Sequence, residues 1–541
     1  MSTTSESSTA EKRSPILDLV EKVGNALPDP VTLFFLGTLG VFGLSWLAVE
    51  QGWRSILLGE GGAELFNETA VNMASAAQLK LLATQLVDIF TAFAPLGPVL
   101  AAAVGIAIAE KSGLITAALK AILVLAPRAL LTPATIFAGV MSSMALDAGY
   151  IVLPPLAAAI YKAAGRSPLA GIAAVFAGVG AGFNANLFIT GLEPILAGLT
   201  EEAAQTIDPE YAVNAACNWY FMIGSTVLLT LVGWFVSARF VEPRLAARSP
   251  EEGGPPVPGQ TSDEGEEEDA TSDLERSLSG REKFGLFGAF AASAALLYGL
   301  YLCWANEWGF LYDEPGILRQ DGGTQAFPTW VSSIIPLLIL VFLIPGMVYG
   351  LIVGTIRSDR DVAKMMSEYL GVLGNYIVLA FFASIFVECF NRSNLDRMLA
   401  VEGGAFLRSL DVPAWVYMVA FIPVVGLANL VIGSMSAKWT MLSQVFVPMF
   451  MLVGVSPELT QVTYRIGDSI TNPITPLNPY MIIMLVFLRQ HVKKGGLGTM
   501  IAPMLPYAVW FGLAWAIMLV GWMLSGQPLG PDAPLSWDPP Q

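Results

Sequence analysis

The stretch YRIGDSITNPITPLNPY, residues 464–480, interrupts a part of the sequence that otherwise has the character of membrane-spanning helix. The segments on either side, MLSQVFVPMFMLVGV (441–455) and MIIMLVFL (481–488), are apolar enough to lie in lipid. Between them stand Arg465, Asp468 and three prolines, residues that are costly inside a span or break its helix. Irregular backbone persists at membrane depth only where protein buries it or where it lines a water-filled cavity. The stretch therefore predicts a broken helix at a binding site.

The composition of the whole chain predicts an all-α polytopic membrane protein. Of the 541 residues, 54% are hydrophobic and 13% are charged, whereas roughly a quarter are charged in soluble domains. Apolar runs such as 31–49 and 334–353 approach or reach the ~20 residues that span a bilayer. The short alternating segments typical of a transmembrane β-barrel do not occur.

The net charge of −16 comes largely from one segment and says little about a substrate. Residues 250–275 contain ten acidic residues and no basic one, which is typical of a solvated, disordered linker. The three cysteines are scattered and the only histidine is His491, so no disulfide or metal pattern is predicted. We expect no cofactor other than a coupling ion, H⁺ or Na⁺, and no nucleic-acid partner.

Clusters of Lys and Arg predict the orientation. They occur in the N-terminal tail, on both sides of the acidic segment, after residue 353 and at 489–494, and should face the cytoplasm. Segments 51–79 and 305–327 carry few positive charges and should lie outside, as should the C-terminal tail. An internal N-terminus and an external C-terminus require an odd number of spans. The predicted organisation is a cytoplasmic tail with an interfacial helix (1–30), a first membrane half (31–240), an acidic cytoplasmic linker (241–283), a second membrane half (284–525) and an external tail (526–541).

The two halves resemble each other. KAAGRSPLAGIAAVFAGVGAGFNAN (162–186) lines up with MLVGVSPELTQVTYRIGDSITNP (451–473), and two upstream pairs of segments match in the same order. Each aligned segment has a Gly-x-Ser-Pro turn, then a helical stretch, then a Gly- or Asn-rich break. With an odd number of spans per half, this predicts an inverted internal repeat with broken helices near the bilayer midplane. Re-entrant hairpins are predicted near 86–111, where FAPLGP would turn the chain, and in the matching region near 366–391.

The two breaks supply the candidate site. Gly180 and Gly182 permit unusual dihedrals and close approach, and Pro473 ends a helical hydrogen-bond ladder. Neutral oxygens and amides that could bind a substrate or a small cation come from both breaks: Asn184, Asn186, Ser469, Thr471 and Asn472. Pro476, like Pro473, cannot continue a helical hydrogen-bond ladder and ends the second break. A Na⁺ ion would be expected near Gly182, Asn186, Ser469 and Thr471.

Arg465 and Asp468 are spaced i, i+3 and share a helix face, which leaves two interpretations. They could form a structural ion pair with each other. Alternatively, Arg465 binds a carboxylate bidentately while Asp468 titrates or coordinates a cation. We favour the second interpretation because a purely structural pair leaves the neighbouring prolines and asparagines unexplained.

Further candidates lie outside the breaks. Trp439, with Ser436 and Lys438, could offer an aromatic face and polar contacts, or could simply pack. Asn429 could contribute to the site or only bond between helices. Asp147, in MALDAGY, is a second candidate for ion coupling. Glu193 follows the first break and is expected to line the path or to lie at an aqueous edge.

At these residues the chain resembles the AbgT family of p-aminobenzoyl-glutamate transporters over nearly its whole length. The resemblance rests on VGNALPDPVTLFF, SSMALDAGYIVLPPLAA, NWYFM and, most specifically, YRIGDSITNPITPLNPY. It implies a homodimeric secondary transporter of a bacterial inner membrane, with about nine transmembrane helices and two re-entrant hairpins per protomer. It also implies ion-gradient-driven transport of p-aminobenzoyl-glutamate and export of sulfonamide antimetabolites. The path residues implied by the resemblance are Asn429, Ser436, Trp439, Pro457, Arg465, Asp468 and Pro476, together with a first-half acid that is expected to be aspartate but is Glu193 here.

Three alternatives remain at this point. A Na⁺-coupled importer of a dicarboxylate or aminoacyl-type anion would use the same residues. An intramembrane enzyme would need metal ligands or a catalytic pair; no H-E-x-x-H occurs, and the duplicated breaks would have no role in it. A passive channel would need no titratable acid at a tight site. We therefore predict a transporter rather than an enzyme.

Overall fold

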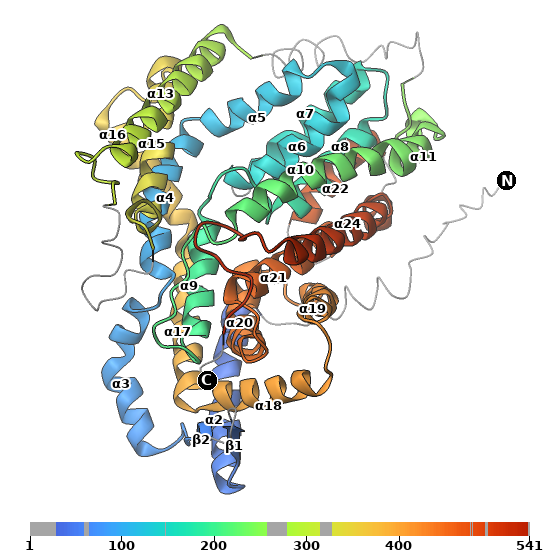
Figure 1. Ribbon diagram of the computed structural model, residues 1–541. Coiled ribbons are helices and arrows are strands. Elements are labelled where there is room, and N and C mark those ends of the chain that lie inside the picture. Colours follow the sequence, from blue (N-terminus) through green and yellow to red (C-terminus); the bar gives the residue numbers. More distant parts are fainter. Residues whose placement is uncertain are drawn as a thin grey trace, which may run out of the picture.

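The computed structural model describes residues 29–58, 64–145, 148–256, 278–313, 327–475, 478, 480–492 and 496–538. The predicted interfacial helix before residue 29, residues 257–277 of the acidic linker, Asp147 and Pro476 lie outside these residues. Helices dominate the described chain, with one small hairpin (Figure 1). This confirms the prediction of an all-α architecture.

The first half begins with an apolar helix and a β-hairpin and continues through short and long helices. Its elements are α2 (Pro30–Glu50), β1 (Arg54–Leu58), β2 (Glu64–Thr69), α3 (Ala76–Thr91), α4 (Leu96–Lys111), α5 (Leu114–Leu125), η1 (Arg128–Leu130), α6 (Leu131–Met141), η2 (Ser142–Ala145), α7 (Ala148–Ala163), α8 (Pro168–Gly182), α9 (Leu192–Ala204), α10 (Trp219–Val236), the π-helical turn η3 (Ser237–Val241), α11 (Glu242–Ala246) and η4 (Pro250–Glu252).

The regular elements of the second half, among the described residues, are all helices. Its elements are α13 (Gly280–Ala305), α14 (Thr329–Ser332), α15 (Ile334–Val353), α16 (Asp359–Val372), α17 (Gly374–Arg392), α18 (Leu395–Ser409), α19 (Ala414–Asn429), α20 (Met435–Met451), α21 (Pro457–Thr471), α22 (Tyr480–His491), α23 (Leu497–Ile501) and α24 (Met504–Ser525).

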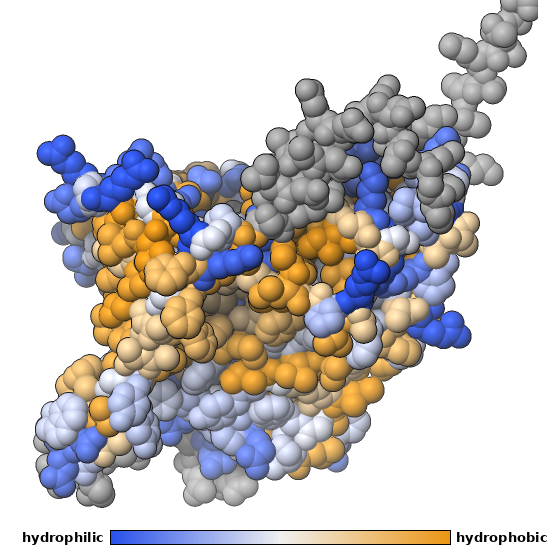
Figure 2. All heavy atoms as spheres, turned by 90° about the horizontal axis from the view of Figure 1, so that it is seen from above, coloured by the Kyte–Doolittle hydropathy of each residue, from blue (hydrophilic) through white to orange (hydrophobic). Residues whose placement is uncertain are grey.

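Long apolar helices account for the membrane character. Among the described residues, seven helical stretches are long and apolar enough to span a bilayer, or eight if one bent pair counts as a span. Apolar side chains cover broad areas of the face in Figure 2, and α13 leaves Phe284, Phe287 and Phe290 exposed. Such a surface suits lipid as its solvent. The expected number of about nine spans stays a prediction.

The structure locates helix breaks in the region of the first predicted hairpin. Residues 92–95 separate α3 from α4, although the two together form one long apolar stretch, Ala76–Lys111. A bend of 118° comes later, between Leu114–Leu125 and Arg128–Met144. In the second half, Leu373 separates α16 from α17. Re-entry of either segment into the membrane stays a prediction.

The matched Gly-x-Ser-Pro turns have the same local structure in both halves. Gly165 and Gly454 have φ angles of +73° and +84°, a conformation that glycine adopts without a steric penalty. Ser167 then caps α8 and Ser456 caps α21, each followed by proline in the first helical turn, where a missing N–H costs nothing. The same sequence motif thus starts both of the helices that end in a predicted break.

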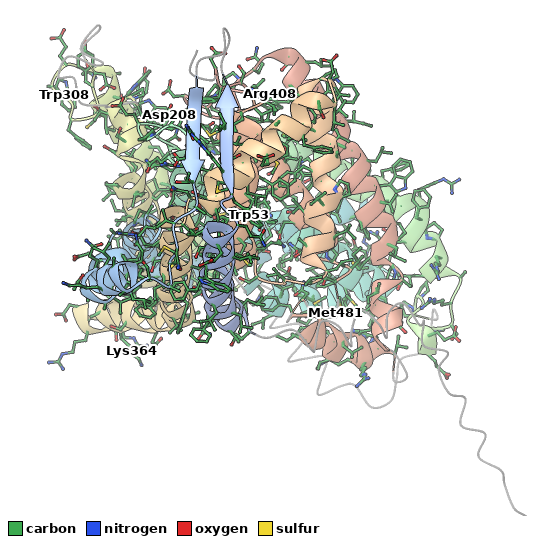
Figure 3. The ribbon with its side chains drawn as sticks, turned by 90° about the horizontal axis from the view of Figure 1, so that it is seen from below. Trp53, Asp208, Trp308, Lys364, Arg408 and Met481 are labelled. Atoms are coloured by element: carbon green, nitrogen blue, oxygen red, sulfur yellow. The ribbon has the colours of Figure 1, made fainter. Side chains whose placement is uncertain are left out.

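The ends of α8 and α21 meet inside the protein, with α9, α19, α20 and α24 around α21 (Figure 1). A Cβ on Gly180 would lie 2.8 Å from Cγ of Pro473, so only glycine allows the two breaks to approach this closely. At the end of the molecule seen in Figure 3, the antiparallel β1–β2 hairpin follows α2, with Trp53 at the junction. The crossing of α8 and α21 is the place to look for a site.

Candidate functional site

Helix α21 carries the polar face of the site through the protein core. Glu458, Gln461, Arg465 and Asp468 are spaced by three, four and three residues, so they lie along one side of the helix. All four are buried; Arg465 is 2% exposed and Asp468 is 1% exposed. Buried charges require partners, and the partners identify the other helices of the site.

Asp468 pairs with Lys438, from the first turn of α20. The Lys438 Nζ atom lies 2.5 Å from Oδ1 of Asp468, and neither side chain is open to solvent. The same Nζ donates to Oδ1 of Asn429 at 2.5 Å. Lys438 therefore places a cation among acceptor oxygens from two helices, α19 and α21.

The second oxygen of Asp468 accepts hydrogen bonds from both breaks. Asn184, just after α8, donates its Nδ2 to Oδ2 of Asp468 at 3.0 Å and to Oγ of Ser469 at 2.7 Å. Asn472, just after α21, donates to the same Oδ2 at 3.2 Å. The structure thus brings together the asparagines predicted from the two halves, with Asp468 between them.

Asn429, the last residue of α19, joins this cluster. Its Nδ2 lies 3.0 Å from the Asp468 carbonyl oxygen, 2.8 Å from Oγ1 of Thr471 and 2.8 Å from Oδ1 of Asn472. Because its Oδ1 also accepts from Lys438, Asn429 bonds between helices and at the same time contacts the charged pair. We name Asn184, Asn429, Lys438, Asp468 and Asn472 the Asp468 cluster.

Arg465 pairs with Glu193 and not with Asp468. Its Nη2 donates to Oε1 of Glu193 at 2.6 Å, and Oε2 of Glu193 accepts from the N–H and the hydroxyl of Thr190 at 2.5 and 2.6 Å. The prediction that Arg465 could pair with Asp468 is wrong: although they share a face of α21, each turns to an opposite charge on a different helix. Glu193, 3% exposed, is not at an aqueous edge either.

Two N–H positions of Arg465 lack a partner. Among the described residues, neither Nε nor Nη1 has a hydrogen-bond acceptor, although both atoms are buried. A buried donor without a partner costs about 1–3 kcal/mol, and more when the group is charged. The guanidinium therefore retains donor capacity for an anionic group.

Trp439 packs and does not form an open aromatic wall. Its ring stacks on Tyr464, with centroids 4.4 Å apart, and its Nε1 donates to Oγ1 of Thr200 at 3.0 Å. The Thr200 hydroxyl in turn donates to Oε1 of Gln461 at 2.6 Å. Of the two interpretations of Trp439, the structure favours packing.

An open cavity adjoins the Asp468 cluster and has different aromatic residues. The rings of Tyr150 and Tyr480 are parallel, with centroids 4.3 Å apart. These two tyrosines line the cavity together with Phe183, Ser436, Asn472 and Asn478. Asn472 therefore links the cavity to Asp468, and Ser436 lies in the cavity wall as a path residue would.

The other predicted residues lie apart from the cluster or outside the described chain. Asn186 donates to Oγ of Ser143 at 2.7 Å, and a Cβ on Gly182 would lie 2.3 Å from Cα of Val140. The four expected Na⁺ ligands thus belong to separate contacts, and the Na⁺ site stays a prediction. Pro457 begins α21, eleven residues before Asp468, or about 16 Å along the helix.

Sequence reasoning missed three features of the site. Lys438 was considered only as a neighbour of Trp439, although it is the only charged residue between Asp411 and Glu458, and a lone charge in such a segment signals a buried partner. Tyr150 ends MALDAGY and Tyr480 ends the 464–480 stretch, but neither was predicted to line a cavity. Sequence reasoning had no signal for the pairing of Arg465 with Glu193, because the two are 272 residues apart.

Comparisons with known proteins agree along the whole chain. The model of the AbgT putative transporter family matches residues 15–537. The p-aminobenzoyl-glutamate transport protein of Escherichia coli strain K12 is 31% identical over 519 residues, covering 95% of each chain.

Two solved structures are similar in both sequence and fold. The YdaH transporter of Alcanivorax borkumensis, described as having an unusual topology, is 37% identical with a TM-score of 0.82, covering 93% of this chain and 100% of its own. MtrF of Neisseria gonorrhoeae, described as illuminating a class of antimetabolite efflux pumps, is 38% identical with a TM-score of 0.85, covering 96% and 100%.

Proposed function

The chain belongs to the AbgT family and is a multi-pass membrane transporter, not an enzyme; on that premise we propose that it is an ion-gradient-driven secondary transporter of p-aminobenzoyl-glutamate and related p-aminobenzoate-like compounds. The observation that carries the proposal is the pair of buried ion pairs, Arg465–Glu193 and Lys438–Asp468, where the two broken helices meet. The relative from Escherichia coli is named for this substrate.

Arg465 is proposed to bind a carboxylate of the substrate. Its unpartnered Nε and Nη1 groups supply charged donors for carboxylate oxygens. The ring of Tyr480, at the wall of the cavity, suits the p-aminobenzoyl ring, since aromatic pairs add about 0.5–1.5 kcal/mol beyond burial. Asn472 and Ser436 supply polar contacts near the amide. The adjacent cavity thus supports a substrate that has both an aromatic amine and carboxylates.

Asp468 is proposed to couple transport to H⁺, with Lys438 as its partner. Both carboxylate oxygens already accept bonds, from Lys438 on one side and from Asn184 and Asn472 on the other. Protonation of Asp468 would neutralise the carboxylate and leave the buried Lys438 ammonium without its counter-charge, so a proton would change the contacts of both residues. Asp147 is proposed as a second coupling residue. Na⁺ coupling is the alternative that the experiment below separates.

The same proposal includes export, assembly and orientation. The similarity to MtrF, described as an antimetabolite efflux pump, supports export of sulfonamides. Homodimers in a bacterial inner membrane are proposed from the family resemblance. The basic residues near Arg244 and Arg281 support a cytoplasmic linker and N-terminus and a periplasmic C-terminus.

Transport in proteoliposomes tests the proposal. Radiolabelled p-aminobenzoyl-glutamate, a sulfonamide and a simple dicarboxylate would be offered under an imposed pH gradient and, separately, a Na⁺ gradient. Accumulation of the first two driven by the pH gradient, and its loss in Asp468→Asn, is the expected result. Movement of the dicarboxylate alone, driven by Na⁺, would instead establish a Na⁺-coupled importer. No accumulation of any of the three would contradict the proposed cargo.

A further inference from the structure

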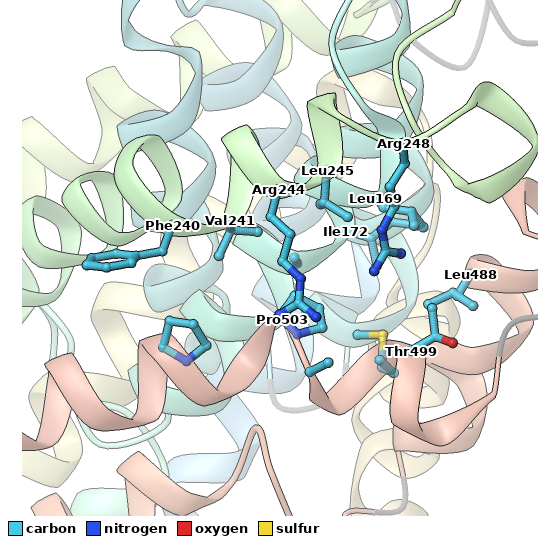
Figure 4. Close-up of a pocket in the computed structure, with 14 residues that line it drawn as sticks. Leu169, Ile172, Phe240, Val241, Arg244, Leu245, Arg248, Leu488, Thr499 and Pro503 are labelled. Atoms are coloured by element: carbon cyan, nitrogen blue, oxygen red, sulfur yellow. The ribbon is translucent and has the colours of Figure 1, made fainter. Parts of the chain in front are cut away.

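A second cavity lies away from the Asp468 cluster, at the end of the long helix that contains α10, η3 and α11 (Figure 4). Its walls come from the first turns of α8, from η3 and α11, and from α22 to α24. Most of the lining is apolar, including Leu169, Ile172, Leu245 and Leu488. The cavity therefore joins the start of one broken helix to the helices that follow the other.

Two arginines reach into this apolar space. Figure 4 shows the side chains of Arg244 and Arg248 extending from the α11 region toward the helices opposite. Within the part of the chain that the structure describes, neither side chain has an ion-pair or hydrogen-bond partner. Their neighbour Arg166 is different, because it pairs with Glu242 and Thr132. The two arginines, Arg244 exposed and Arg248 partly buried, therefore border the apolar lining without a counter-charge among the described residues.

The backbone turns these arginines toward the cavity. The π-helical turn η3 precedes them, and a π turn contains an extra residue, which shifts every later side chain around the helix axis. Such turns occur frequently at functional sites. The turn is held by Ser237, whose hydroxyl donates to the Gly233 carbonyl at 2.8 Å and lies 2.5 Å from the Tyr507 hydroxyl. The orientation of Arg244 is thus built into the packed helix, and Arg248 follows two residues after the end of α11.

We propose that Arg244 and Arg248 bind the phosphate of an anionic phospholipid, whose glycerol and acyl carbons lie against the apolar residues at the mouth of the cavity between α8, α11 and α22–α24. Basic pockets between transmembrane helices on the cytoplasmic side recognise anionic headgroups, and arginine matches phosphate bidentately. A free phosphate ion would satisfy the arginines but not the leucine-lined walls. The acidic linker is an alternative partner for the arginines because its charge is opposite to theirs. Its hydrophilic sequence, however, does not suit an apolar cavity.

Bound lipid would join the cytoplasmic ends of the two broken-helix units. Leu169 and Ile172 belong to α8, which ends near Asn184, whereas Leu488 belongs to α22, which follows the second break. A headgroup bound at α11 therefore restrains α8 and α22 relative to the long helix that contains α10, η3 and α11. This inference concerns a lipid site and does not depend on the identity of the transported compound.

Lipid binding to the full-length purified protein tests the inference. The protein in detergent would be titrated with phosphatidylglycerol, phosphatidylcholine, glycerol phosphate and inorganic phosphate, with the thermal midpoint and retained lipid in native mass spectrometry as readouts. Phosphatidylglycerol should raise the midpoint and remain bound, whereas the other three should not. The variants Arg244→Gln and Arg248→Gln should each weaken its binding at least about tenfold.

Arg239→Gln is the matched control, because Arg239 lies in the same helix, is exposed and does not line the cavity. It should bind phosphatidylglycerol like the wild type, and Arg244→Lys should bind with intermediate affinity because lysine retains the charge. Equal effects of phosphatidylglycerol and phosphatidylcholine, or an equal loss in the Arg239 variant, would overturn the proposal. So would stabilisation by inorganic phosphate alone.

A variant of the acidic linker provides a further test of the lipid site. Eight acidic residues lie between 263 and 275, and changing each to its amide leaves the chain length intact. Unchanged binding of phosphatidylglycerol supports the lipid site. Binding that occurs only after this change would show that the linker occupies the arginines instead, and the proposal would be wrong.

Discussion

The Lys438 ammonium lies 2.5 Å from the Asp468 carboxylate in a place closed to solvent. The two residues come from α20 and α21, and the remaining oxygen of Asp468 accepts bonds from Asn184 and Asn472 at the two helix breaks. One charged pair of the second half is therefore bonded to residues at both helix breaks. A change in the protonation of Asp468 would alter hydrogen bonds at both helix breaks.

Replacing Lys438 by methionine should abolish transport and destabilise the protein. Asp468 would remain as a buried charge without its partner, and breaking such a pair costs about 3–5 kcal/mol. The double variant Lys438→Met/Asp468→Asn should recover much of the lost thermal midpoint but no transport. If the single variant transports normally, or if the double variant recovers transport, the pair is structural only. Proteoliposome uptake and thermal unfolding provide the two readouts.

Replacing Arg465 by lysine should weaken substrate binding while preserving the fold. Lysine can still pair with Glu193 but lacks the Nε and Nη1 donors of the guanidinium that are proposed to bond to a carboxylate. The loss of a hydrogen bond to a charged group, about 1.5–3 kcal/mol, predicts p-aminobenzoyl-glutamate binding weaker by about ten- to a hundredfold. A neutral sulfonamide, which has no carboxylate, should bind nearly as before. Equal losses for both ligands would place the carboxylate elsewhere.

Tyr480→Leu and Trp439→Phe should have different effects, although both change an aromatic residue near the site. Tyr480 lines the open cavity, so its loss should weaken binding of p-aminobenzoyl compounds about two- to tenfold. Trp439 is enclosed between Tyr464 and Thr200, so its replacement should lower the thermal midpoint with little effect on affinity. Calorimetric titration and thermal unfolding separate the two effects; a reversed pattern would restore Trp439 as the substrate-facing residue.

Gly180→Ala should separate the two helix breaks. The new methyl group would meet Cγ of Pro473 at 2.8 Å and disturb the bond from Asn472 to the Gly180 carbonyl. Overpacking of this kind typically costs about 1–3 kcal/mol, and uptake should fall with the thermal midpoint. Gly43→Ala is the control, because it lies inside α2 with open space around its Cβ; a helical alanine there should be neutral or slightly stabilising. Similar midpoints for both variants would contradict the close crossing.

The class of protein and the location of the breaks could be predicted from local sequence. Apolar runs, the Gly-x-Ser-Pro turns and the polar interruption at 464–480 each act over a few residues, because hydrophobicity and helix capping are short-range properties. Because these signals recur in both halves, Asn184 and Asn472 could also be predicted as residues of the candidate site. The structure confirms that both contact Asp468.

The partners of the buried charges could not be predicted in this way. Helical spacing places Arg465 and Asp468 on one face of α21 and suggests that they pair, yet tertiary packing brings Glu193 of α9 to the first and Lys438 of α20 to the second. Arg465 and Asp468 are each neutralised by an opposite charge on another helix, so they need not bond to each other along α21. The sequence by itself determined the helices, their breaks and the polar residues within them, since these follow from local chemistry. Only the tertiary structure decided which charges meet, because that depends on how helices hundreds of residues apart are packed.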